Sequence, residues 1–188
     1  MKIVFALVDY DNAIEEWENT QADVGLNLSV LCSRLSARLS ALIPGSENLT
    51  VRLYGGWNTA GNQPTRRADW LLAELPNYRK RFGPLRVRPS IVTELIIRSD
   101  LTFIGTYQNQ EQKMVDGMLM VDALELATDA NIAVAVVSDD DDFVPAIISG
   151  AERRKSTNPI YLLRRVKTPG AALNDGLLTR CNVRLASY

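Results

Sequence analysis

The sequence predicts an α/β fold in which helices flank a mainly parallel central sheet, forming a three-layer sandwich. Two apolar runs, at residues 2–8 and 132–137, are continuous rather than alternating, which is typical of parallel strands buried on both faces. Strand-like and helix-like segments also alternate along the chain, as βαβ units require. The length of 188 residues suits one compact domain, so we expect a single domain over residues 1–188.

The first part of the chain is predicted to contain two strands and two helices. Apolar residues recur at helical spacing between residues 22 and 43, and Pro44 with Gly45 is expected to stop that helix. A second helix begins at residue 66 and is expected to end at Pro76. The predicted strands are 2–8 and 49–54, and the predicted helices are 22–43 and 66–75.

The middle of the chain is harder to assign, because three extended runs there are punctuated by arginines. We predict a basic insertion around residues 78–110, as a ribbon or a hairpin. The remaining predicted elements are a helix at 111–128, a strand at 132–137, a helix at 146–154, a strand at 160–163, a helix at 171–178 and an edge strand at 183–185.

The composition excludes several kinds of site. Histidine is absent, which rules out Ser-His-Asp triads, Cys-His pairs and imidazole zinc sites. Cys32 and Cys181 are interpreted as reduced thiols. No run of about 18 apolar residues occurs, and the short apolar start reaches acid at once, so we expect no membrane span and no signal peptide. These features together predict a cytoplasmic protein.

The net charge of −1 conceals four blocks of alternating sign. Residues 1–51 carry −4, residues 52–98 carry +6, residues 99–151 carry −9 and residues 152–188 carry +6. Two interpretations remain open. The blocks are solvated surfaces, or the acidic segments converge in a cleft that the basic segments frame. The second arrangement suits a polyanion bound around an acidic metal site.

Acidic residues follow two of the predicted parallel strands. Asp9, Asp11 and Asn12 follow the first strand, and Ser138 with four consecutive aspartates at 139–142 follows the strand at 132–137. Ligand sites of parallel sheets lie at the carboxyl ends of strands, and carboxylates crowded there favour a hard divalent cation such as Mg²⁺ or Mn²⁺. The alternative is that these residues cap a helix or form a turn.

The predicted helix at 111–128 carries further acid. On a helical wheel Asp116 and Asp122 lie within or at the edge of an apolar arc, and Lys113 lies one turn from Asp116. A desolvated carboxylate needs a partner. Asp116 is therefore either another metal ligand or one half of a structural pair with Lys113.

Three motifs together resemble the NYN domain of the PIN-like nuclease superfamily, over most of the chain. They are Val8-Asp9-Tyr10-Asp11-Asn12, then Lys113-Met114-Val115-Asp116 with Asp122 six residues on, then Ser138-Asp139-Asp140-Asp141-Asp142-Phe143-Val144-Pro145. Met114 and Asp139 depart from the family pattern, which has glycine at both positions. The resemblance implies that the catalytic, metal-binding residues are Asp9, Asp116, Asp140 and Asp142, and that the supporting residues are Asn12, Lys113, Asp122, Ser138 and Asp139.

The resemblance implies an endoribonuclease that hydrolyses RNA with Mg²⁺ or Mn²⁺ and activated water. The residues themselves do not distinguish RNA from DNA. Trp57, Trp70 and Tyr78 are candidates for stacking on bases or for core packing. The basic residues expected to bind the phosphate backbone are Arg66, Arg67, Arg79, Lys80, Arg81, Arg86, Arg88, Arg153, Arg154 and Lys155.

Other interpretations stay open at the level of sequence. One is a catalytically silent module of the same fold that binds RNA or a protein. Another is a haloacid-dehalogenase-like phosphatase, whose nucleophile loop would be residues 9–13, although Ala13 stands where that loop has Thr or Val. Self-association into a homodimer is a third expectation, because PIN-like nucleases often pair.

Overall fold

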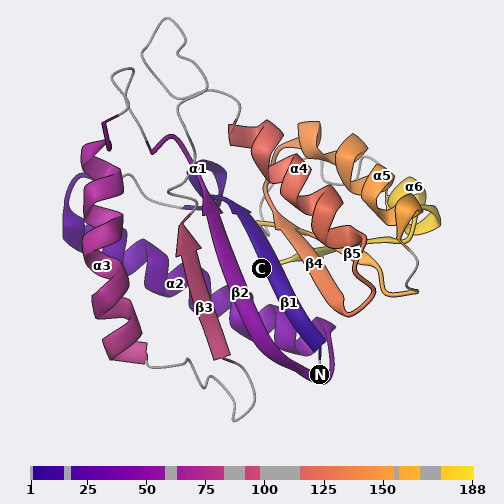
Figure 1. Cartoon of the computed structure of the whole chain (residues 1–188), viewed down its shortest axis with the longest axis horizontal. Coiled ribbons are helices and arrows are strands. Elements are labelled where there is room, and N and C mark those ends of the chain that lie inside the picture. The colour runs from indigo at the N-terminus through magenta and orange to yellow at the C-terminus, as the bar shows by residue number, and fades with distance from the viewer. Residues whose placement is uncertain are drawn as a thin grey trace, which may run out of the picture.

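The computed structural model describes residues 2–14, 18–57, 63–82, 92–97, 115–154, 157–165 and 175–188. Within these residues six strands form one all-parallel sheet in the order β3-β2-β1-β4-β5-β6 (Figure 1). The predicted α/β sandwich is thereby confirmed. The strands are β1 (Lys2–Asp9), β2 (Ser46–Tyr54), β3 (Val92–Ile97), β4 (Ile132–Val137), β5 (Ile160–Arg164) and β6 (Val183–Ser187).

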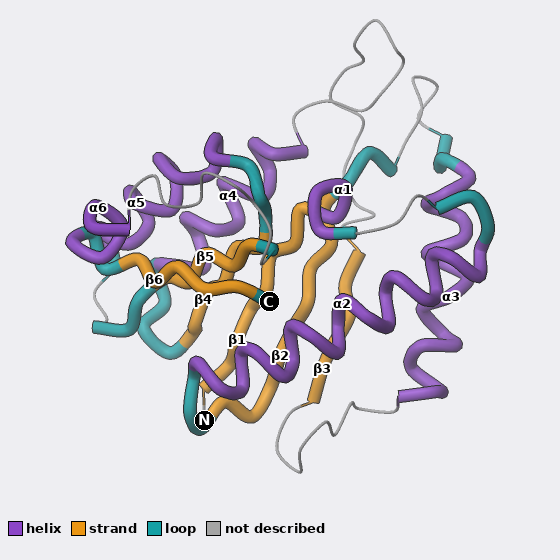
Figure 2. The backbone as a smooth tube through the Cα atoms, turned by 180° about the vertical axis from the view of Figure 1, so that it is seen from behind, coloured by secondary structure: helices purple, strands orange, loops and turns teal. Residues whose placement is uncertain are grey.

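Helices cover both faces of the sheet. In Figure 1 α4 and α5 lie in front of it, and in Figure 2, seen from behind, α2 crosses the opposite face. Two apolar clusters follow this division, one joining the sheet to α2 and α3 and the other joining it to α4, α5 and α6. The helices are α1 (Tyr10–Ala13), α2 (Gln21–Leu42), α3 (Arg66–Phe82), α4 (Val115–Ala127), α5 (Val144–Arg153) and α6 (Asp175–Arg180), with a 3₁₀ turn η1 (Asp141–Phe143).

Local signals explain where α2 begins and ends. Thr20 and Asp23 form a capping box: the Asp23 amide donates to the Thr20 hydroxyl (3.3 Å), and the Thr20 amide donates to the Asp23 carboxylate (2.9 Å). The helix ends at Leu42, and Gly45 two residues beyond the cap has a φ of 77°. The prediction that Pro44 and Gly45 follow the helix is confirmed.

Two predictions about the middle of the chain need correction. The helix expected to end at Pro76 continues to Phe82. Proline removes one backbone hydrogen bond but does not by itself stop a helix. The segment Val92–Ile97, within the predicted basic insertion, is the edge strand β3 and pairs in parallel with β2. The rest of that insertion beyond residue 82 lies outside the described residues.

The strand order places a topological switch point between β1 and β4. From β1 the order runs to β2 and β3 on one side, and from β4 it runs to β5 and β6 on the other. Crossover connections leave the sheet in opposite directions at such a point, which opens a crevice outside the carboxyl ends of the two central strands. The residues that follow β1 and β4 are therefore the natural place for a ligand site.

Two further features concern covalent links and membranes. Cys32 is buried, Cys181 is partly exposed, and neither forms a disulfide. None of the described helices combines the length and the apolar character that crossing a bilayer requires.

The packing of α2 generates a stability prediction. Leu28 is fully buried in the core, whereas Leu26 on the same helix is 61% exposed. Leu28→Ala should lower the free energy of unfolding by about 2–5 kcal/mol, because it removes buried methylenes and leaves a cavity. Leu26→Ala, the same chemical change, should alter it by about 0.5 kcal/mol or less. Urea denaturation measures both, and equal losses would contradict the described packing of α2.

Candidate functional site

Asp9, the last residue of β1, is the most buried carboxylate at the switch point, with 5% of its surface exposed. Its Oδ2 atom accepts hydrogen bonds from Asn12 Nδ2 (2.6 Å) and from Ser138 Oγ (2.7 Å). Burial raises the pKa of Asp9, and these two hydrogen bonds oppose that rise by stabilising the charged form. The Ser138 contact joins the end of β4 to the end of β1.

Ser138 also organises the loop after β4. Its hydroxyl oxygen accepts a hydrogen bond from the Asp140 amide (3.1 Å), and the Asp140 carboxylate accepts one from the Asp142 amide (2.9 Å). Asp140 is thus the N-cap of η1, the role that the capping alternative assigned to this run. Capping and ligand binding are compatible, because the cap bond uses one carboxylate oxygen.

Asp116 brings a carboxylate from α4 to the same edge. It lies in the first turn of the helix and is exposed. Partial desolvation raises its pKa most, and the negative charges of Asp9, Asp140, Asp11 and Asp142 raise it further. Carboxylates from β1, α1, the loop after β4 and α4 therefore lie close enough to repel one another.

The donor set fits a hard divalent cation, since it consists of carboxylate oxygens with an excess of negative charge. Within the part of the chain that the structure describes, no three Asp, Glu or Cys side chains already stand together as a ligand group. A cation would therefore have to draw these carboxylates closer together.

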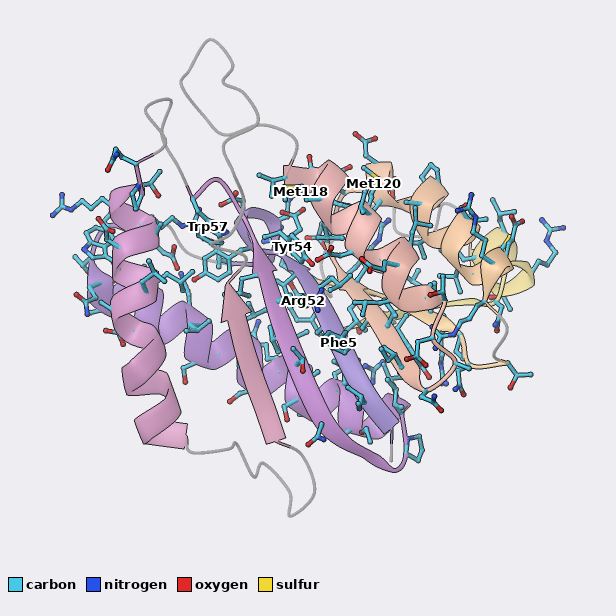
Figure 3. The ribbon with its side chains drawn as sticks, in the orientation of Figure 1. Phe5, Arg52, Tyr54, Trp57, Met118 and Met120 are labelled. Carbon is cyan, nitrogen blue, oxygen red and sulfur yellow. The ribbon has the colours of Figure 1, made fainter. Side chains whose placement is uncertain are left out.

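Asp122 lies apart from this group, in a buried contact between α4 and β2. Its Oδ2 atom accepts hydrogen bonds from the Tyr54 hydroxyl (2.5 Å) and from Arg52 Nη1 (3.1 Å). Figure 3 shows Tyr54 and Arg52 on β2, with Phe5 beside them, and the Arg52 guanidinium lies 4.8 Å from the Phe5 ring centroid. Asp122 thus anchors the helix that carries Asp116.

Two aspartates of the 139–142 run are held by arginines at the carboxyl end of β5, of which Arg164 is the last residue of the strand and Arg165 the next in the chain. Arg165 forms an ion pair with the Asp139 carboxylate, and its backbone amide donates to Asp139 Oδ1 (2.9 Å). Arg164 forms an ion pair with Asp141. Sequence reasoning missed both arginines. The available signal was their position directly after a buried strand, at the sheet edge where the aspartates were expected.

Comparison with known proteins bears on this arrangement. A family model described as the NYN domain matches residues 7–175, a span that includes Asp9, Asp116, Asp140 and Asp142. The chain belongs to the NYN domain family. NYN domains are PIN-like, are typically nucleases and generally use divalent metals. Neither the curated proteins nor the solved structures gave a match to this chain.

Family membership does not make every predicted basic residue of this NYN domain an RNA contact. Arg67 is held by neighbouring side chains. Its guanidinium forms ion pairs with Asp11 and with Glu18 (2.6 Å) and lies 4.9 Å from the Tyr10 ring centroid. Trp57 packs on the same ring and is buried, so it fills the core rather than offering a surface for bases. These contacts give the partly exposed Arg67 side chain a structural role, and its phosphate contact stays a prediction.

The pairing of Asp11 also bears on the phosphatase interpretation. That alternative makes Asp11 the second acid of a nucleophile loop, yet Asp11 is ion-paired with Arg67 and the chain is an NYN domain. Both observations disfavour a phosphatase.

Arg153 and Arg154, two of the predicted phosphate contacts, lie at the amino edge of the sheet, opposite the edge that carries the carboxylates. Arg154 is buried, and its guanidinium donates to the carbonyl of Ile132, the first residue of β4. Asp9, in contrast, ends β1, which is parallel to β4. Arg154 is therefore a structural residue, and the exposed Arg153 beside it lies near the amino edge, away from the carboxylates.

The other predicted basic residues are described to different extents. Arg66 is exposed, and its guanidinium lies 4.8 Å from the Trp70 ring centroid. For the three basic residues of α3 beyond Pro76 the structure describes the backbone only. These are Arg79, Lys80 and Arg81, while Arg86, Arg88, Lys113 and Lys155 lie outside the described residues.

The anchor at Asp122 generates a prediction. Tyr54→Phe removes the hydroxyl that donates to the buried Asp122 carboxylate, so it should lower the free energy of unfolding by about 1–3 kcal/mol. Urea denaturation of Tyr54→Phe, Asp122→Asn and the double variant gives the coupling between the two side chains. A coupling near zero would show that the contact does not anchor α4.

The raised pKa of Asp116 generates a pH prediction. An acid whose pKa is higher in the folded state than its ordinary 3.8 destabilises the fold once ionised, so its cost grows as pH rises above about 3.8. Asp116→Asn should therefore raise the thermal midpoint of the metal-free protein at pH 7, and the gain should vanish below pH 3.8.

Glu125→Gln provides the control for this experiment, because Glu125 is an exposed acid on the same helix, α4. We expect its thermal midpoint to follow that of the unmodified chain across the same pH range. Lower stability of Asp116→Asn at pH 7 would contradict the mutual repulsion described for the site.

Proposed function

We propose that this NYN domain is a divalent-metal-dependent endoribonuclease whose cation, Mg²⁺ or Mn²⁺, is held by Asp9, Asp116, Asp140 and Asp142. The observation that supports the proposal is the gathering of these carboxylates at the switch point, where desolvation and then their mutual repulsion raise the pKa of Asp116. Uncompensated negative charge is costly in a folded protein, and a bound cation relieves it.

The neighbouring polar residues have positioning roles in this proposal. Asn12 and Ser138 hold the Asp9 carboxylate in one orientation through two hydrogen bonds. Ser138 also fixes the Asp140 amide, and so ties the loop after β4 to β1. When bound, such a cation supplies activated water and neutralises charge on the scissile phosphate. Because water rather than the ribose 2′-hydroxyl attacks, the products carry a 5′-phosphate and a 3′-hydroxyl.

Among the predicted phosphate contacts, Arg66 is the one whose surroundings support RNA binding. We assign Arg66 to the phosphate backbone, since it is exposed at the start of α3, and its stacking on Trp70 fixes its direction. The basic residues between 79 and 88 remain predicted contacts. Family membership favours RNA over DNA as the substrate.

A second candidate is an NYN domain that binds RNA without cutting it. The specific observation in its favour is that the described residues contain no group of three Asp, Glu or Cys side chains arranged as metal ligands. Binding of labelled RNA with no turnover under Mg²⁺ or Mn²⁺ would decide for this function.

The endoribonuclease proposal is tested by substituting two of the carboxylates. Asp116→Asn and Asp140→Asn should each lower the rate of cleavage of labelled RNA in Mn²⁺ by about 100-fold or more, because several kcal/mol of electrostatic stabilisation is lost. Glu125→Gln on the same helix is the matched control and should cleave at the unmodified rate. Unchanged cleavage in both aspartate variants would overturn the proposed site.

A further inference from the structure

The four consecutive aspartates after β4 differ in their partners. Asp139 and Asp141 are ion-paired with Arg165 and Arg164, respectively. The carboxylate of Asp140 caps the Asp142 amide instead. The first and third aspartates of the run are therefore neutralised by arginines at the end of β5. The second and fourth form no ion pair with a described residue.

The pairing follows from the register of β4 and β5. Val137 of β4 lies beside Leu163 of β5, and the Ser138 amide donates to the Leu163 carbonyl (3.2 Å). Arg164, the last residue of β5, and Arg165 after it therefore reach the carboxyl edge directly beside the aspartate run. Because the strands are parallel, this juxtaposition is built into the sheet.

Asp140 and Asp142, which have no ion pair with a described residue, are the aspartates connected to the rest of the site. The Asp140 amide and the Asp9 carboxylate share the Ser138 hydroxyl. Asp140 and Asp142 also lie close enough to Asp116 for their negative charges to act on it. The Arg165 guanidinium, in addition to its pair, donates to the Ile14 carbonyl (3.4 Å), which joins this loop to the segment after α1.

We propose that Arg164 and Arg165 are positioning residues that neutralise Asp141 and Asp139 and so reserve Asp140 and Asp142 for the cation. The inference rests on the proposed metal site and assigns a role to residues outside it. Without the arginines all four aspartates would compete for the cation and would add two further negative charges to a site that is already crowded.

The two pairs differ in how safely they can be tested. The Arg164 side chain is 7% exposed, so replacing it endangers the fold. Arg165 is 37% exposed and its partner Asp139 is 13% exposed, which makes this pair the better target. Asp139→Asn keeps a side-chain oxygen that can accept the hydrogen bond from the Arg165 amide. The substitution therefore removes the negative charge and preserves this hydrogen bond.

The experiment measures the dissociation constant of Mn²⁺ by electron paramagnetic resonance on the full chain without RNA. Arg165→Gln frees the Asp139 charge and should tighten Mn²⁺ binding by about threefold to tenfold. Asp139→Asn removes one negative charge beside the Arg165 guanidinium and should weaken binding by a similar factor. The double variant Asp139→Asn with Arg165→Gln should return to within about twofold of the unmodified chain, because the two changes cancel in net charge.

Two controls accompany this cycle. Arg165→Lys keeps the positive charge and should bind Mn²⁺ within about twofold of the unmodified chain. Arg180→Gln makes the same charge change at an exposed residue of α6, just before the amino end of β6, and should leave the dissociation constant unchanged. Thermal midpoints of all variants in the absence of metal report whether each one folds.

Three results would overturn the inference. Single variants that shift Mn²⁺ binding in the same direction would indicate a general loss of structure. A double variant as weak as Asp139→Asn would make Asp139 a ligand itself. If Arg165→Gln leaves Mn²⁺ affinity unchanged and, in a separate titration, no longer binds labelled RNA, Arg165 is a phosphate contact. If the unmodified chain binds no Mn²⁺, the proposed function itself fails, and this inference fails with it.

Discussion

Repulsion among carboxylates at the carboxyl ends of β1 and β4 is the interaction on which the organisation of this edge depends. An all-parallel sheet sends every strand end to one edge, and the switch point between β1 and β4 opens that edge at its centre. The chain supplies aspartates at both of these strand ends, so folding alone concentrates negative charge there. The surrounding contacts distribute and offset that charge.

Each of the described contacts offsets a different part of the repulsion. Hydrogen bonds from Asn12 and Ser138 stabilise the Asp9 carboxylate, and Arg67 neutralises Asp11 from α3. Arg165 and Arg164, at the carboxyl end of β5, neutralise Asp139 and Asp141, respectively. The repulsion that is not offset acts on Asp116, whose pKa is raised by desolvation and by the neighbouring carboxylates. The cation that we propose for this edge would relieve that remaining repulsion.

The rigidity of the site comes from the packing beneath it. Asp122 receives hydrogen bonds from Tyr54 and Arg52, so α4 is fixed to β2 about two turns beyond Asp116. Tyr54, which binds Asp122, lies beside Asp9 in the register of β1 and β2. The contact that holds α4 and the buried Asp9 carboxylate are therefore on neighbouring strands at the same level of the sheet. A shift of α4 would therefore move Asp116 relative to Asp9.

Periodicity and strand-end position were enough to predict the α/β class, the positions of most elements and the acidic strand ends. These properties are local: the apolar pattern reports burial, and parallel strands align their carboxyl ends. Pro76 misled the prediction of the end of α3, because a proline lowers helix stability without deciding it. Tertiary structure alone decided which charges meet, since a charged side chain looks the same in sequence whether it faces water, an ion pair or a carbonyl. It paired Arg67 with Asp11, buried Arg154, joined Asp122 to Tyr54 and brought Arg164 and Arg165 to the aspartates, because those partners come from distant strands and helices.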